Sequence, residues 1–187
     1  MVEESKIIFR PFGFRKEDEQ LIEEMYRLCK DQQRKLFDLT VPTEDLLSFI
    51  EYCLTQPKSL YIAAIDIEQG KVCAIFSLEN IRYYQDFILE AEQHCVFARH
   101  SWGKKAREIV ARYFAYLEDN LKPIKRLVAF VPQHNFGVIK LLKDSGFKLE
   151  GTLQDALIYP DKEDNPKFYN QLVYTKVNKE IKLDVIR

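Results

Sequence analysis

Hydrophobic and polar residues recur along this chain with two different periods, and each period predicts one kind of element. Apolar positions spaced by three and four predict helices, whereas short alternating or wholly apolar runs predict strands. The helical period covers residues 17–30, 41–54, 104–120 and 135–146. Strands are predicted at residues 6–14, 59–67, 71–79, 87–98, 126–131, 147–158 and 169–177.

Capping residues place several of the boundaries between these elements. Thr43 is the expected N-cap of the second helix, and Asn135 is the expected N-cap of the last one. Gly146 suits the C′ position after the last helix, where a Schellman motif folds Phe147 back on Leu142. These local signals agree with the hydrophobic periods and support the same assignment.

The predicted elements follow the order β-α-α-β-β-β-α-β-α-β-β. Residues 126–131 form a continuous apolar run between two prolines, which is typical of a strand buried on both faces. Hairpins in the first half and a β-α-β unit in the second predict an α/β fold, with a mixed central sheet and helices on both faces. We expect one domain over residues 1–187, with a core at about 6–177 and a tail at 178–187.

Composition narrows the setting in which the protein works. The 187 residues are 47% hydrophobic and carry a net charge of −1, which excludes a general attraction to nucleic acid or anionic membranes. The four cysteines are widely spaced and show no zinc-binding pattern, so we expect reduced thiols and no metal site. The chain begins without a signal-peptide pattern, and no segment reaches the roughly 18 apolar residues of a membrane span. We therefore expect a soluble cytoplasmic protein.

A cluster of positive charge lies where the third helix should begin. Within residues 98–108 the cations are Arg99, Lys104, Lys105 and Arg107. A helix N-terminus carries a partial positive charge and disfavours such residues. A multiply charged anion, bound by the unpaired N–H groups of that helix, explains the cluster. A solvated basic face beside the buried stripe of the helix explains it equally well.

The residues around this cluster resemble one known family. "RHSWGKKA", an amphipathic helix, a buried strand and then "NFGVIKLLKDSGF" are similar to the GNAT superfamily of N-acetyltransferases, most closely over residues 90–151. The pyrophosphate loop of that family has a Trp-Gly-Lys-Gly core. Glu92 with His94, and Glu150 with Gly151 after a Gly-Phe pair, resemble bacteriophage-encoded members. The resemblance implies the GNAT fold with a splayed central mixed sheet.

The resemblance also implies acetyl-CoA as the acyl donor and a primary amine as the acceptor. The strand before the loop would lie along the pantetheine arm, the loop would hold the pyrophosphate, and the Asn that begins the last helix would lie near the pantetheine. The implied cofactor contacts are Val96, Phe97, Arg99, Ser101, Trp102, Gly103, Lys104, Lys105, Ala106 and Asn135.

Three positions depart from the family pattern. Lys105 stands where glycine is usual, so its side chain either crowds the pyrophosphate or reaches round to pair with it. Val138 replaces a small residue, and Leu142 stands where many members have a tyrosine that acts as general acid. Lys105 and Leu142 keep a second hypothesis open, in which the fold serves as a catalytically silent binding or assembly module, for instance in a phage particle.

Strand periodicity selects candidates for the catalytic base. Glu90, Glu92 and His94 share one face of the strand at 87–98, and a polar stripe on an interior strand must face water or a polar cleft. Glu92 can take a proton from the amine through water, and His94 titrates near neutral pH. Alternatively, the glutamates pair with lysines on a partly exposed strand and His94 is a satisfied core histidine.

Two segments, residues 30–42 and 159–170, are expected to line the acceptor site, and both mix charged with aromatic residues. A protein amine, a peptide N-terminus and a small metabolite all stay open as acceptors. We expect no nucleic-acid or membrane partner, a monomer or a homodimer, and a cytoplasmic location, which is the host cytoplasm if the protein is phage-encoded.

Overall fold

The computed structural model describes residues 6–36, 44–56, 58–160 and 166–181, and its elements follow the predicted order. The strands are β1 (Ile7–Phe12), β2 (Leu60–Asp66), β3 (Lys71–Tyr84), β4 (Phe87–Phe97), β5 (Arg126–Pro132), β6 (Lys148–Pro160) and β7 (Pro166–Val177). The helices are α1 (Glu19–Leu36), α2 (Leu46–Thr55), α3 (Lys104–Asn120) and α4 (Phe136–Asp144), with the 3₁₀ turns η1 (Lys16–Asp18) and η2 (Arg99–Ser101). The predicted α/β class is therefore confirmed.

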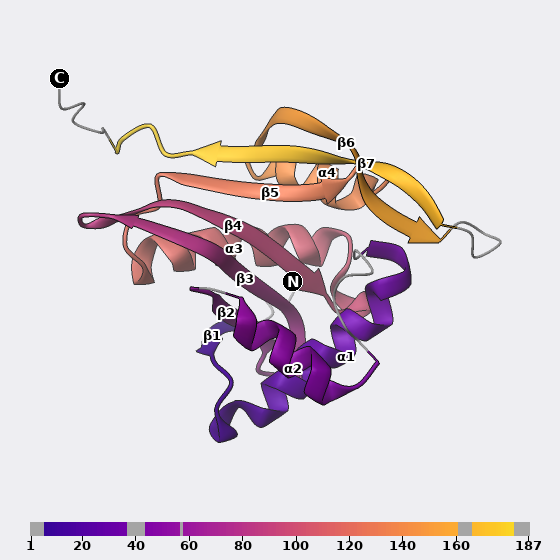
Figure 1. Ribbon diagram of the computed structural model, residues 1–187. Helices are drawn as coiled ribbons and strands as arrows, with labels where there is room; N and C mark the ends of the chain where they lie inside the picture. The colour runs from indigo at the N-terminus through magenta and orange to yellow at the C-terminus, as the bar shows by residue number, and fades with distance from the viewer. Residues whose placement is uncertain (1–5, 37–43, 57, 161–165, 182–187) are drawn as a thin grey trace.

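The strands form one mixed sheet in the order β1-β2-β3-β4-β5-β7-β6. All neighbouring strands are antiparallel except β4 and β5, which run parallel and pair only at Ala91–Leu127 and Glu92–Val128. Beyond Glu92 the two strands separate toward their carboxyl ends, as Figure 1 shows. The sheet is thus two half-sheets joined at a short seam, and the splay implied by the family resemblance is present.

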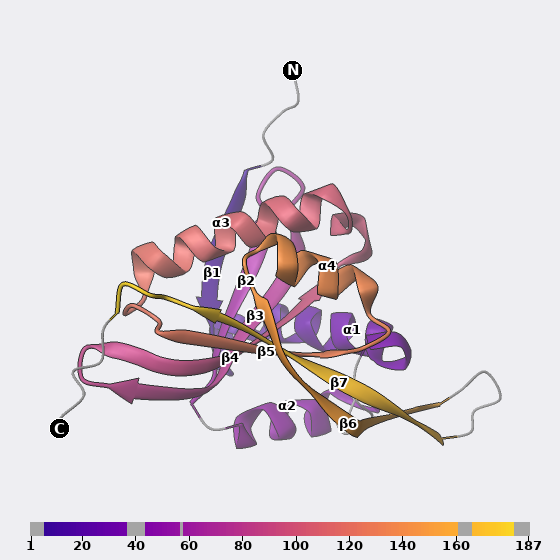
Figure 2. The ribbon, with the colours of Figure 1, turned by 90° about the horizontal axis from the view of Figure 1, so that it is seen from above.

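Helices cover both faces of this sheet (Figure 2), and each face has its own hydrophobic core. One core packs α1 and α2 against β2–β4, and the other packs α3 and α4 against the opposite face. In the second core the ring of Tyr113 stacks on Phe76 with centroids 3.9 Å apart and planes 7° apart. Burying one such aromatic side chain stabilises the fold by about 1.5–3 kcal/mol.

Most helix ends follow the predicted chemistry. The side chain of Asn135 accepts a hydrogen bond from Val138 N–H at 3.2 Å, as expected of an N-cap. After α4, Gly146 N–H donates to Lys143 O and Phe147 N–H donates to Leu142 O, both at 3.0 Å. This pair of bonds is the Schellman motif that the sequence predicts.

The start of α2 differs from the prediction. Its N-cap is Asp45, whose carboxylate accepts from Ser48 N–H at 2.9 Å. Thr43 lies outside the described residues. The helix begins at Leu46, so the N-cap position is residue 45, and its side chain is the one placed to bind the N–H of Ser48. Within the described chain, no helix is long and apolar enough to span a membrane.

The left-handed backbone at Gly146 gives a direct test of the α4 terminus. Its φ of +85° favours glycine, so Gly146→Ala should lower the free energy of unfolding by about 1–2 kcal/mol even though a Cβ there meets no atom within 4 Å. Gly151→Ala is the matched control, because a Cβ there is equally unhindered and its φ lies outside the left-handed region. Urea unfolding of both variants should show a loss for Gly146→Ala alone, and equal losses would contradict this account of the turn.

Candidate functional site

The separation of β4 and β5 opens a cleft of about 320 Å³ through the sheet. Its walls come from both layers, with Met25 of α1 and Phe49 of α2 on one side and Leu142 of α4 on the other. His94 and Glu79 lie among the otherwise largely apolar lining. No group of side chains suited to holding a metal ion occurs in the residues that the structure describes.

Three cysteines also line this cleft, and none is poised as a nucleophile. They are Cys29, Cys53 and Cys95. Burial raises the pKa of each thiol to about 12, so all three stay protonated at neutral pH.

The edge of β4 along the cleft carries backbone groups that the sheet leaves open. Ala98 N–H donates to Cys73 O of β3 at 2.9 Å, and backbone polar groups alternate in direction along a strand. Cys95 and Phe97 therefore direct N–H and C=O toward the cleft, whereas Val96 directs its own toward β3. Of the two predicted backbone partners, Phe97 has this geometry and Val96 does not.

The carbonyl of Phe97 is already engaged by the chain itself. It accepts hydrogen bonds from the Trp102 indole N–H at 3.2 Å and from Gln32 Nε2 at 2.5 Å. These bonds tie the turn after β4 and the end of α1 to the rim of the cleft. Trp102, predicted as a cofactor contact, donates this hydrogen bond within the chain, and about half of its surface stays exposed.

The N-terminus of α3 follows β4 after the short turn η2, and no side chain caps it. Gly103 is the N-cap residue with φ 76°. The backbone N–H groups that begin α3, at Lys104, Lys105 and Ala106, therefore form an open donor set. The hydroxyl of Ser101 is fully buried beside them and has no hydrogen-bond partner among the described residues.

The predicted cations at this turn separate into two kinds. Arg99 and Lys104 are exposed. Lys105 instead turns inward, and its Nζ lies 3.0 Å from Oδ2 of Asp66, a buried residue at the end of β2. The lysine thus neither crowds the helix terminus nor reaches round it, because its charge is neutralised by Asp66. The bond from Lys105 holds the pKa of Asp66 below its usual value.

The predicted acid–base pair, Glu92 and His94, shares one face of β4, and a third residue on β3 lies beside it; His94 lines the cleft. His94 Nε2 is 3.7 Å from the Glu92 carboxylate and 3.8 Å from that of Glu79 on β3. The β3–β4 register sets Glu79 directly opposite Glu92, and Ser77 Oγ donates to Glu79 at 2.7 Å. Glu79 was missed from the sequence, because only the strand register shows that it faces the pair.

Opposing effects set the protonation of this cluster. Burial acts to lower the pKa of His94, but the carboxylates of Glu92 and Glu79 outweigh it and the pKa is raised. The same contact with His94 lowers the pKa of Glu92. The contact between the two residues therefore favours the protonated form of His94 and the ionised form of Glu92.

The remaining predicted residues occupy defined places. Asn135 lines the cleft while it caps α4, so both of its expected roles fit one position. Ala106 is buried at the first turn of α3. Glu90, the third member of the predicted stripe, forms ion pairs with Arg82 and Arg126. Its carboxylate is bound by these two guanidinium groups and does not contact His94 as Glu92 does. The expected acceptor segments, 30–42 and 159–170, fall partly outside the described residues.

Comparison with known proteins places this fold among N-acetyltransferases. No protein-family model matches the sequence, and no curated protein matches it. Solved structures do match. Spermidine N-acetyltransferase from Vibrio cholerae, in complex with CoA and spermine, has a TM-score of 0.69 at 16% identity and covers 93% of this chain and 96% of its own. The chain therefore has the fold of this enzyme.

Two further structures give the same result. Ribosomal-protein-S5-alanine acetyltransferase from Vibrio fischeri has a TM-score of 0.65 at 17% identity, covering 94% of this chain and 96% of its own. An acetyltransferase of the GNAT family from Streptococcus pneumoniae has a TM-score of 0.63 at 14% identity, covering 92% and 100%. The GNAT-like fold predicted from the sequence is confirmed.

The Asp66–Lys105 pair predicts a specific dependence of stability on pH. Asp66→Asn should lower the free energy of unfolding at pH 7 by about 1–3 kcal/mol, because a half-buried ammonium loses its partner. The folded-state pKa of Asp66 is lowered, so its contribution is present above the unfolded value of about 3.9 and is lost as the pH falls below it.

Urea unfolding of both proteins across pH 3–7 measures this difference. The gap between wild type and Asp66→Asn should narrow toward pH 3, and it should vanish in a Lys105→Met background. A gap that is constant with pH, or that persists without Lys105, would contradict the pairing.

Proposed function

We propose that this protein is an acetyl-CoA-dependent N-acetyltransferase, which transfers an acetyl group to a primary amine. The observation that carries the proposal is the cleft between β4 and β5 with an uncapped helix N-terminus at the end of its β4 wall. Such a terminus binds phosphate, and a strand edge binds the amides of an extended arm. A CoA thioester has both a pyrophosphate and an amide-containing arm.

The residues at the turn fit such a ligand. The backbone N–H groups at the start of α3 would hold the pyrophosphate, with Arg99 and Lys104 adding positive charge beside it. A Cβ at Gly103 meets nothing within 4 Å, so there is open space over the turn. The buried hydroxyl of Ser101 is a donor without a partner among the described residues. The N–H of Phe97 and the N–H and C=O of Cys95 would pair with the pantetheine amides, because the Phe97 carbonyl is already bound within the chain.

The polar cluster on β4 supplies the proton chemistry. Acetyl-CoA brings the activated acetyl group when it is bound. An amine reaches the cleft as an ammonium ion, which the carboxylates of Glu79 and Glu92 attract. Ionised Glu92, or the neutral fraction of His94, then takes a proton, directly or through water, so that the nitrogen lone pair can attack the carbonyl. A new C–N bond replaces the C–S bond, and the thiolate leaves.

No side chain with an available proton stands where the family resemblance expects a general acid. Leu142 lines the cleft at that point and has none to give. The hydroxyl of Tyr113 is buried and donates to Gln93 Oε1 at 2.9 Å, so it is committed elsewhere. The leaving thiolate therefore takes its proton from solvent in this proposal.

Leu142 also favours a second candidate function, in which the protein binds CoA without catalysis. The two functions separate in one assay that follows free thiol. Release of CoA thiol with any member of a broad amine panel supports the enzyme. Binding without release across the whole panel supports the silent module. A protein amine, a peptide N-terminus and a small polyamine all belong in the panel, because solved enzymes with this fold act on spermidine and on ribosomal-protein alanine.

Isothermal titration with acetyl-CoA tests the anion site. We expect binding in the micromolar range, and Lys104→Glu should weaken it about 3- to 30-fold, since the substitution changes the charge by two and each charge at a helix terminus contributes about 0.3–1 kcal/mol. Lys122→Glu is the matched control, because Lys122 is an exposed lysine just past the opposite end of the same helix. No binding at high micromolar ligand, or equal loss in both variants, would overturn the assignment.

The titration of His94, followed by NMR of the imidazole proton, tests the acid–base cluster. Glu92→Gln should lower the pKa of His94, because burial is then opposed by Glu79 alone. His100 serves as the internal reference in the same sample, since its lowered pKa comes from burial and from Lys105 and Lys71. An unchanged His94 in Glu92→Gln, or a His100 that moves with it, would argue against coupling between His94 and Glu92.

A further inference from the structure

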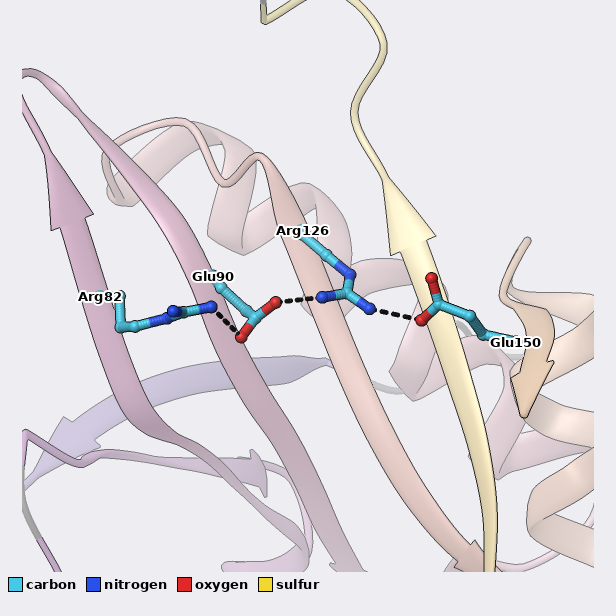
Figure 3. Close-up of polar contacts among 4 residues, drawn as sticks. All are labelled: Arg82, Glu90, Arg126 and Glu150. Carbon is cyan, nitrogen blue, oxygen red and sulfur yellow. Dashed lines mark hydrogen bonds and ion pairs between the residues drawn. The ribbon is translucent and has the colours of Figure 1, made fainter. Parts of the chain in front are cut away.

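Four charged side chains form a continuous row across one face of the sheet (Figure 3). Arg82 Nη2 donates to Glu90 Oε1 at 2.5 Å. The guanidinium of Arg126 then donates to Glu90 through Nη1 and to Glu150 through Nη2. The row begins on β3 and ends on β6, and β7 lies between Arg126 and Glu150.

One of these three links crosses the seam of the sheet. Glu90 lies on β4 and Arg126 on β5, which pair only at Ala91–Leu127 and Glu92–Val128, with a bridge at Ile88–Ile124. Every other pair of neighbouring strands is joined by a longer ladder. Among the described residues, Glu90–Arg126 is the one ion pair that connects the two half-sheets.

The geometry of Arg126 suits a fixed connection. Its planar guanidinium presents two N–H edges in fixed directions, so each carboxylate holds it in one orientation. The side chain of Arg126 is 35% exposed and that of Glu90 is 20% exposed, so solvent screens this pair only in part. Burial acts to lower the pKa of Arg126, but Glu150 and Glu90 outweigh it and raise the pKa, which keeps the guanidinium charged.

The link also lies next to the point where the cleft opens. The strands separate immediately after the Glu92–Val128 pair, and Glu90 is two residues before Glu92 on the same face. The angle between the half-sheets sets the width of the cleft and the distance from β5 of the residues beyond Glu92, such as His94. The ion pair lies beside the short paired segment that joins the half-sheets, where the strands themselves contribute few hydrogen bonds.

We propose that Arg126 is a positioning residue that, through Glu90, holds the two half-sheets at the splay needed to bind the acyl donor. This rests on the proposed function for what fills the cleft, but the clamp itself is a property of the sheet. Without the link, the angle between the half-sheets varies in the free protein. Fixing that angle when the ligand binds then costs free energy and lowers the affinity. The affinity for acetyl-CoA should then fall more than the overall stability does.

The test compares Arg126→Gln with Arg82→Gln. Both remove one arginine partner of Glu90, but Arg82 joins β3 to β4 across an extended ladder and does not cross the seam. Arg126→Gln should weaken acetyl-CoA binding about 5- to 10-fold and raise KM for acetyl-CoA more than it lowers kcat. Arg82→Gln should change both by less than about 2-fold. Glu90→Gln, which removes the link from the other side, should behave like Arg126→Gln and provides a second variant if the first does not fold.

Hydrogen exchange without any ligand keeps this test separate from the proposed function. Backbone amides of β5 near Leu127 and Val128 should exchange at least 5-fold faster in Arg126→Gln than in wild type, and at the wild-type rate in Arg82→Gln. If wild type does not bind acetyl-CoA while the exchange result holds, the proposed function fails and the clamp stands. Equal exchange in the two variants, or equal affinity for acetyl-CoA, would overturn the clamp.

Discussion

The early end of pairing between β4 and β5 is the constraint on which the rest of this structure depends. Two strands that stop pairing inside a domain leave N–H and C=O groups that must find partners. Phe97 shows one solution, because Trp102 and Gln32 bind its carbonyl. The open edge at Cys95 has room beside it for a ligand that carries amides of its own. The cleft is therefore a consequence of the sheet, and its chemistry follows from what lines that edge.

Charge is distributed so that the turn before α3 and the polar cluster on β3 and β4 differ in sign. Buried and half-buried charges that would disturb the site are neutralised within the chain, as Lys105 is by Asp66 and Glu90 by Arg126. What is left at the start of α3 is positive and open to solvent. What is left on β3 and β4 is the cluster of Glu79, Glu92 and His94, in which contact with His94 favours the ionised form of Glu92. An anionic donor at the turn and a cationic acceptor at the cluster match this arrangement.

Much of the fold could be predicted from the sequence because its signals are local. The period of α3 and the caps of α4 lie within a few residues of the elements that they define, and both are confirmed. The predicted N-cap of α2, Thr43, was wrong. Thr43 and Asp45 both precede the same apolar stripe, and both side chains can accept a hydrogen bond from a helix N–H, so spacing alone does not show which one caps the helix. Glycine and proline residues mark where helices and strands end, and these boundaries predicted the order of the elements.

The site was predicted less completely because its contacts are distant along the chain. Asp66 is 39 residues from Lys105, and no local pattern links the two. Glu79 joins His94 only through the register of β3 with β4. Glu90 and Glu92 look alike in the sequence, yet arginines on neighbouring strands pair with the first and leave the second beside His94. The different partners of Glu90 and Glu92 depend on which strands are neighbours in the sheet, and the hydrophobic periodicity of the sequence does not show that order.

A crystal structure of the protein with CoA tests the central claim most directly. The account predicts the pyrophosphate on the backbone N–H groups of Lys104 to Ala106, the pantetheine along Cys95 and Phe97, and Lys105 still bound to Asp66. A pyrophosphate bound elsewhere on the surface, with the space between β4 and β5 filled by the chain's own side chains, would contradict it.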